Sequence, residues 1–216
     1  MGPPRHATHP PESLADRRSR RAAVDDPAVV LAAAARFLEA RPRSAAEVRR
    51  RLRDAGYRAD LVEGALDRLT ELGYLDDAAF ARAWVESRDR AQPRGARALR
   101  DELRRKGVAP AAAEAALAAR EARASGADPD DPRLVPGVGE LAASEASDDG
   151  AAARLLARKG AGVLREPDLR KRRAKAYALL ARAGFDPGTA GRASAAWLAK
   201  TGTISTDDDA EPAAEP

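Results

Sequence analysis

The sequence has no cysteine, no asparagine, one glutamine (Gln92) and only two histidines, His6 and His9. Without cysteine there is no disulfide framework and no thiolate metal site, a composition that fits a reducing cytoplasm. Both histidines lie in a proline-rich N-terminal stretch, so the rest of the chain lacks histidine for acid–base or metal chemistry. No P-loop, dinucleotide-binding glycine pattern or nucleophile elbow occurs. The sequence therefore predicts no enzyme, no cofactor site and no metal site.

Aromatic residues and long apolar runs are also scarce. Aromatics make up 4% of the chain, so alanine and leucine must fill most of the core, which favours helices. The longest apolar run, Val29 to Ala35, is about a third of what a bilayer span needs, and it follows two aspartates instead of a basic region. We therefore predict neither a signal peptide nor a membrane helix, and we expect a cytoplasmic protein.

The charge is unevenly distributed. The formal net charge is +4, but residues 203–216 carry five acidic residues and no base, which leaves the preceding chain with an excess of about nine positive charges. A basic body with an acidic tail favours an anionic partner. The alternative is a generically charged surface in a protein rich in arginine and alanine. The acids of the tail are Asp207, Asp208, Asp209, Glu211 and Glu215.

A short unit occurs three times: a basic helical stretch, a leucine, three residues, a glycine and an apolar residue. The glycines are Gly56, Gly107 and Gly184, followed by Tyr57, Val108 and Phe185. Glycine adopts the left-handed conformation that ends a helix without a Cβ penalty. The repeated leucines are Leu52, Leu103 and Leu180, so the first two copies lie 51 residues apart and the next two 77 apart. A repeat of this kind predicts an array of small helical units.

Apolar periodicity and caps predict three helices in each unit. Ser44 and Glu47 have capping-box spacing, Asp26 or Asp25 can cap the preceding helix, and Asp76 the first helix of the second unit. The fold prediction is all-α, with tandem three-helix repeats (three units) in an elongated, curved array and disordered termini. The predicted segments are a disordered leader (1–26), repeat 1 (27–73), repeat 2 (74–122), a flexible insertion (123–147), repeat 3 (148–201) and an acidic disordered tail (202–216).

The middle helix of each unit is the basic one. Aligned on the repeated leucine, Arg49 matches Arg100 and Arg53 matches Arg104, so a basic stripe is one interpretation. The other is a solvated face with local ion pairs such as Arg50 with Asp54. In the third unit the cations come earlier, at the helix start, where they oppose the helix dipole and an external anion would relieve that cost. The candidate binding residues are Arg49, Arg50, Arg53, Arg97, Arg100, Arg104, Arg105, Arg170, Lys171, Arg172 and Arg173.

These residues resemble the RecX family, regulators of the bacterial recombinase RecA. The specific part is the junction GYLDD followed by Phe-Ala. The positions that carry the resemblance are Ser44, Glu47, Leu52, Gly56, Gly73, Tyr74, Leu75, Asp76, Asp77, Phe80, Gly95, Leu103, Gly107, Gly184 and Phe185. The resemblance implies a protein that binds the RecA filament on single-stranded DNA, inhibits its ATPase and strand exchange, and so restrains recombination and the SOS response.

Two other functions stay open. Three-helix units with a basic helix also suit a helix-turn-helix transcriptional regulator. The near absence of asparagine and glutamine argues against base reading, so we expect sequence-independent binding to single-stranded and, more weakly, double-stranded DNA. A scaffold that binds only protein is the third possibility, and it would not bind DNA at low salt. No heptad seam is present, so we expect a monomer.

Overall fold

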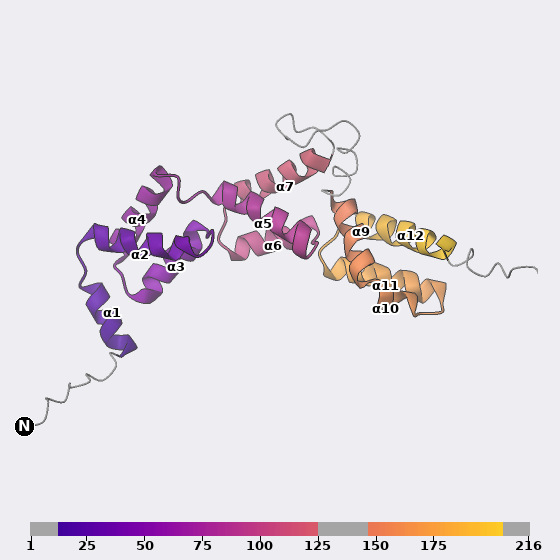
Figure 1. Cartoon of the computed structure of the whole chain (residues 1–216), viewed down its shortest axis with the longest axis horizontal. Coiled ribbons are helices and arrows are strands. Elements are labelled where there is room, and N and C mark those ends of the chain that lie inside the picture. The colour runs from indigo at the N-terminus through magenta and orange to yellow at the C-terminus, as the bar shows by residue number, and fades with distance from the viewer. Residues whose placement is uncertain (1–12, 125–146, 205–216) are drawn as a thin grey trace, which may run out of the picture. The chain divides into compact units, whose positions relative to one another are not determined.

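The computed structural model describes residues 13–124 and 147–204, and every regular element in these ranges is a helix (Figure 1). The all-α prediction is confirmed. The chain divides into two compact units, residues 1–80 and 81–216. The helices are α1 (Leu14–Ala22), α2 (Pro27–Glu39), α3 (Ala45–Ala55), α4 (Ala59–Glu71), α5 (Asp77–Ala91), α6 (Ala96–Arg105), α7 (Pro110–Ala124), α9 (Asp148–Lys159), α10 (Ala161–Leu164), α11 (Leu169–Arg182) and α12 (Pro187–Ile204).

The three predicted helix stops have the same backbone geometry. Gly56, Gly107 and Gly184 have φ values of 104°, 75° and 86°, in the left-handed region. After each glycine, the next residue donates its N–H to the carbonyl of the repeated leucine, at 3.2 Å for Leu52, 3.1 Å for Leu103 and 3.3 Å for Leu180. This is the hydrogen bond of a Schellman motif, which satisfies a helix-end carbonyl. The repeated leucines themselves are at most 2% exposed.

The predicted N-terminal caps are present. Ser44 and Glu47 form a reciprocal capping box at the start of α3, and the Asp26 carboxylate accepts the Ala28 N–H at 2.8 Å. Asp76 accepts from the N–H groups of Ala78 and Ala79 at 2.8 and 2.9 Å, so capping explains this carboxylate.

Asp77, the neighbour of Asp76, has a role that the sequence did not reveal. Its Oδ1 accepts the backbone N–H of Ala45, the first residue of α3, at 2.9 Å. In the second unit Asp148, the first residue of α9, accepts the N–H of Ala96 at the start of α6 at 3.2 Å. In both places an aspartate at the start of a later helix (α5 or α9) accepts a hydrogen bond from a backbone N–H at the start of a middle helix (α3 or α6). That N–H has no acceptor within its own helix.

The leader prediction is wrong for part of its length, because residues Leu14–Ala22 form α1. Ser13 and Asp16 make a capping box, and Arg20 and Arg21 follow in the last turn, so local caps and charges favour a helix that has no apolar period. Arg21 also contacts the ring of Tyr57, with its Cζ 5.8 Å from the ring centroid. Residues 1–12, 125–146 and 205–216 of the predicted leader, insertion and tail lie outside the described residues.

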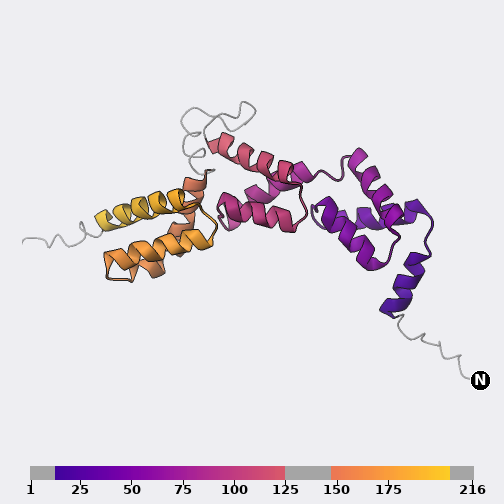
Figure 2. The ribbon, with the colours of Figure 1, turned by 180° about the vertical axis from the view of Figure 1, so that it is seen from behind.

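In the first compact unit, α2 packs against both α3 and α4 (Figure 2). The inward residues recur at helical spacing, as the sequence predicted, and Leu75 of the junction closes the same core. The buried residues of this core are Val30, Ala34, Val48, Leu52, Val62, Ala65, Leu66, Leu69 and Leu75.

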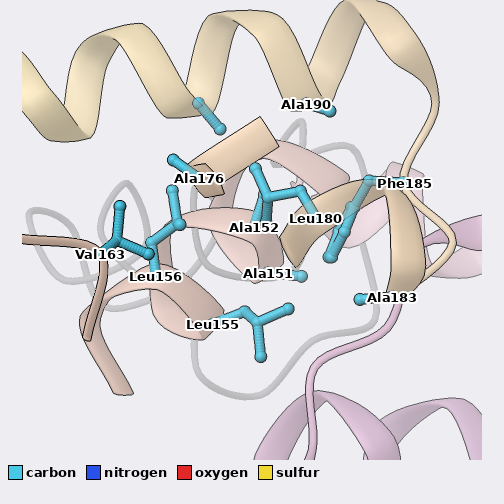
Figure 3. Close-up of a cluster of buried hydrophobic side chains, with 11 residues drawn as sticks. Ala151, Ala152, Leu155, Leu156, Val163, Ala176, Leu180, Ala183, Phe185 and Ala190 are labelled. Carbon is cyan, nitrogen blue, oxygen red and sulfur yellow. The ribbon is translucent and has the colours of Figure 1, made fainter. Parts of the chain in front are cut away.

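In the second compact unit, α9, α11 and α12 enclose a core of alanine and leucine, with Phe185 at one end (Figure 3). The short helix α10 was not predicted. It covers this core with Val163, which is 8% exposed, and separates α9 from the middle helix α11. The third group of helices therefore has four members, because the link between its first and middle helices folds into a turn of its own.

Two glycines bring α6 and the end of α11 into backbone contact. The Gly95 N–H donates to the Ala183 carbonyl at 3.1 Å, and a Cβ built on Gly95 would lie 2.2 Å from the Gly184 oxygen. A Cβ on Gly184 would lie 2.4 Å from that of Ala98. No side chain fits at either position, so these glycines fix how the helix groups α5–α7 and α9–α12 pack.

A fully buried arginine completes this joint. Arg120 at the end of α7 donates to both oxygens of Asp89, at 2.9 and 2.8 Å, and also pairs with Asp148. Burial raises the pKa of Asp89, while the opposite charge of Arg120 acts against that rise. In the first repeat, the positions equivalent to Arg120 and Asp89 are 51 residues earlier and are occupied by Leu69 and Leu38. These leucines belong to an apolar core, so the buried ion pair replaces an apolar contact.

We expect Gly95→Ala to destabilise the protein by about 1–3 kcal/mol, because the added methyl group overlaps a backbone carbonyl that cannot move alone. Gly64→Ala is the matched control. Gly64 is exposed in α4 with no atom within 4 Å of its Cβ position, so alanine there should stabilise by up to about 1 kcal/mol. Urea unfolding of both variants measures the difference, and equal effects would show that the close approach is unimportant.

Arg120→Ala should cost about 3–5 kcal/mol in the free energy of unfolding, because it removes the bidentate partner of the buried Asp89 carboxylate and leaves it only the longer contact to Arg154, at 4.0 Å. The double variant Arg120→Leu with Asp89→Leu copies the apolar pair of the first unit and should recover most of this loss. Asp148 keeps its hydrogen bond to the Ala96 N–H in both proteins. A double variant as unstable as Arg120→Ala would contradict the assignment of the cost to the buried Asp89 charge that has lost its main partner.

Candidate nucleic-acid interface

The structure pairs the aligned arginines of α3 and α6 with acids of the next helix. Arg49 makes a bidentate contact to Glu63, with Nε and Nη2 2.9 and 2.8 Å from its oxygens, and Arg53 contacts the same carboxylate at 2.8 Å. In the second unit Arg100 makes the equivalent contact to Glu114, at 2.7 and 3.1 Å. Glu63 and Glu114 lie 51 residues apart, so the ion pair belongs to the repeat.

These contacts change the electrostatics of the predicted stripe. The hydrogen bond from Arg49 lowers the pKa of Glu63, and that from Arg100 lowers the pKa of Glu114. Arg104 pairs with Asp101 at 2.9 Å, on its own helix. Four of the candidate cations, Arg49, Arg53, Arg100 and Arg104, are thus partly neutralised by carboxylates of their own unit.

Other candidates on the same helices remain exposed. Within the part of the chain that the structure describes, Arg50, Arg97 and Arg105 form no ion pair. The suggested local pairs, Arg50 with Asp54 and Arg97 with Asp101, are therefore wrong. The carboxylate partners come instead from fourteen residues further along the chain, because α3 and α4, like α6 and α7, pack side by side.

The largest group of exposed cations lies on α11. Arg170, Lys171 and Arg173 are exposed and, within residues 13–124 and 147–204, have no acidic partner. Arg172 differs, since its Nε donates to the Glu166 carbonyl at 2.8 Å.

The expected external anion at this helix start is not needed. Asp168 is the N-cap of α11, and its carboxylate accepts from the N–H groups of Arg170 and Lys171 at 2.8 and 3.2 Å. The Asp168 carboxylate is therefore the anion at the N-terminus of α11. It compensates the helix dipole there, so the dipole does not predict an external anion.

Two exposed apolar side chains accompany the α11 cations. Leu169 is 70% and Tyr177 38% exposed, and with Arg173 between them they follow the i, i+4, i+8 spacing of one helix face. We call Leu169, Arg170, Arg173 and Tyr177 the α11 face, and Lys171 lies on the other side of the helix, the side of Lys175 and Arg182. Exposed cations beside an aromatic ring are two of the features by which proteins bind single strands without sequence preference.

The junction motif is mostly structural. Leu75 and Phe80 are buried, Asp76 and Asp77 cap helices, and Gly73 has a φ of 74°. Tyr74 is the exception, with 70% of its surface exposed. The sequence predicted one motif. In the structure most of its residues stabilise the fold, and the Tyr74 ring is exposed to solvent.

None of the helices in the described ranges combines the length and the apolar composition that a bilayer span requires. Across the same ranges, no three carboxylate or imidazole side chains converge as potential metal ligands. The described surface is thus characterised by exposed cations and a few exposed apolar residues on a purely helical scaffold.

Comparison with known proteins places this scaffold among regulatory helical-repeat proteins. Residues 31–69 match the first three-helix domain of RecX, and residues 76–117 match the second. The regulatory protein RecX of Mycolicibacterium vanbaalenii is 45% identical over 89 residues, which are 41% of this chain and 48% of that protein. The corresponding protein of Prosthecochloris aestuarii is 43% identical over 81 residues, 38% of this chain and 54% of that protein.

The chain thus spans about half the length of these curated relatives. The crystal structure of RecX from Lactobacillus salivarius has the same fold, with a TM-score of 0.59 at 18% identity over 81% of this chain and 98% of that one. The two matched domains occur in the same order as in RecX, and over residues 31–117 the chain is similar to the RecX family of regulatory proteins.

The ion pair between Arg100 and Glu114 predicts a specific pH dependence. Because the folded pKa of Glu114 is below its unfolded value of about 4.3, the pair contributes stability above that pH and loses it as the pH falls through the folded pKa. In Arg100→Ala, the NMR titration of the Glu114 carboxyl should return to the ordinary range. Arg97→Ala, an exposed arginine of the same helix, should leave it unchanged, and a normal Glu114 titration in the unmodified protein would contradict the assignment.

Proposed function

We propose that the protein regulates the RecA recombinase by binding the filament that RecA forms on single-stranded DNA and by inhibiting its ATPase and strand exchange, in the cytoplasm and as a monomer. The observation that carries the proposal is the match of residues 31–69 and 76–117 to two successive RecX domains. The relatives are named as regulatory proteins.

The physical argument concerns modular binding to a repeating partner. A nucleoprotein filament presents the same surface at regular intervals, and tandem helical units give several weak contacts whose combined avidity exceeds that of each one. We assign the DNA part of this contact to the α11 face with the nearby Lys171, and to the exposed Arg50, Arg97 and Arg105. The paired Arg49, Arg53, Arg100 and Arg104 contribute less, because their charge is shared with Glu63, Glu114 and Asp101.

A charge-reversal experiment tests this assignment. The variant Arg170→Glu, Lys171→Glu and Arg173→Glu should weaken single-stranded DNA binding at low salt. It should also flatten the salt dependence by up to about 0.7 for each phosphate that the protein no longer neutralises. The charge-conserving variant Arg170→Lys, Lys171→Arg and Arg173→Lys is the matched control and should bind almost as the parent does.

The regulatory activity is measured on the DNA-dependent ATPase of the cognate recombinase. Inhibition at well below one protein per recombinase subunit, reduced in the charge-reversed variant, is the expected result. An unchanged ATPase together with sequence-selective duplex binding would favour the helix-turn-helix regulator. Absence of any DNA binding at low salt would favour the protein-only scaffold.

A further inference from the structure

A shallow cleft of about 280 Å³ lies between the end of α9, the short helix α10 and one face of α11. Lys175, Leu179 and Arg182 line one side, at the i, i+4, i+7 spacing of a single helix face. Lys159, Gly162 and Val163 line the other. The cleft therefore has an apolar floor and three cationic side chains around it.

The absence of a side chain at Gly162 keeps the cleft open. A Cβ built there would meet no atom within 4 Å, so the wall of α10 leaves room beside Leu179 and Val163. The cleft depends on the link helix α10, and it lies beside the α11 face, which extends along the more exposed side of the same helix.

The charge around the cleft is incompletely neutralised. Lys175 pairs with Glu166, whose side chain is 15% exposed. Lys159 and Arg182 have no acidic partner within the described residues, in contrast to Arg49 and Arg100 of the earlier units. A ligand with several negative charges and a small apolar surface complements this cleft.

A segment of this composition begins nearby in the same chain. Helix α12 ends at Ile204, and Trp197 packs close to Gly160, which follows Lys159: a Cβ on Gly160 would lie 2.3 Å from the indole. Both ribbon views show the end of α12 at the same end of its helix group as α10 (Figures 1 and 2). The next twelve residues, 205–216, span up to about 40 Å when extended and contain five acids and no base.

We propose that the acidic segment Ser205–Pro216 binds in this cleft of its own chain, with the run Asp207–Asp209 against Lys159 and Arg182. The bound segment neutralises Lys159 and Arg182, the cations of the cleft that lack an acidic partner within the described residues, and competes with an anionic partner for them. The docking is independent of the function proposed above. Only its consequence, weaker binding of single-stranded DNA by the full chain, rests on that function.

The absence of native cysteine allows a direct test on the full-length chain. Ala210→Cys creates a single thiol beside the three aspartates for a nitroxide label. At low salt the amide signals of Gly162, Ala178 and Leu179 should lose most of their intensity, and 1 M salt, with a Debye length of about 3 Å, should restore it. No broadening at low salt, or equal broadening at Gly64 and other exposed positions of the first unit, would overturn the proposal.

Three variants of the labelled protein locate the binding position. Gly162→Leu adds a side chain to the cleft wall at a position whose Cβ meets no atom within 4 Å and should abolish the broadening, whereas Gly64→Leu, at an equally open exposed helical glycine, should leave it intact. Replacing Asp207, Asp208 and Asp209 by asparagine should also abolish it. Gly162→Leu with undiminished broadening and a normal spectrum would place the tail elsewhere and contradict the cleft assignment.

The consequence is measured separately. Deletion of residues 205–216 should raise the low-salt affinity for single-stranded DNA severalfold, and Gly162→Leu should do the same in the full chain. If Gly162→Leu abolishes the nitroxide broadening but leaves the DNA affinity unchanged, the docking is supported and the competition is rejected. DNA-induced shifts at Gly162 and Leu179 that are equal with and without the tail would show that nucleic acid occupies the cleft, which overturns the proposed competition.

Discussion

The arrangement of the helices depends on one local interaction that occurs three times, the hydrogen bond from the residue after a left-handed glycine to the carbonyl of the repeated leucine. It ends the middle helix at a fixed point and turns the chain toward the next helix. The leucine that accepts the bond also has its side chain in the core. Backbone geometry and side-chain packing are therefore set by the same residue, and the register of each helix group follows from it.

The basic residues of the chain fall into two groups, those that form ion pairs with acids of the same unit and those that do not. In α3 and α6, the equivalent residues Arg49 and Arg100 form bidentate pairs with Glu63 and Glu114, so much of their charge contributes to holding the middle and last helices together. On α11, Arg170, Lys171 and Arg173 lack such partners within the described residues, and exposed Leu169 and Tyr177 lie on the same helix. Net charge does not distinguish paired from unpaired cations, and only the unpaired ones leave their full charge available to a partner.

The sequence predicted the helix stops, the caps at Ser44, Asp26 and Asp76, and most of the core, because these features depend on residues within one or two turns of each other. It missed α1, whose helix comes from a capping box at Ser13 without an apolar stripe. It also missed α10, which has four residues and too short a pattern to detect. The local ion pairs proposed for Arg50 and Arg97 failed for a related reason, since the acids that matter belong to another helix.

The candidate site was harder to predict than the fold because contacts between distant residues determine which cations are free. Arg120 illustrates the difficulty: its sequence context is an ordinary alanine-rich helix, but it is fully buried between Asp89 and Asp148. One feature of the repeat could have predicted these contacts. Glu63 and Glu114 are 51 residues apart, as are Arg49 and Arg100, and this shared spacing indicates an arginine–glutamate ion pair within each unit.

The joint around Arg120 also bears on how this chain accommodates length changes. Arg120 lies four residues before the end of α7 and pairs with the first residue of α9, so the two ends of residues 125–146 are tied together by contacts outside that stretch. For a connection between fixed ends, each doubling of length costs only about 0.6 kcal/mol. Insertions and deletions at this place are thus nearly neutral for folding, and relatives of this protein are free to differ there in length while the helices on either side pack in the same way.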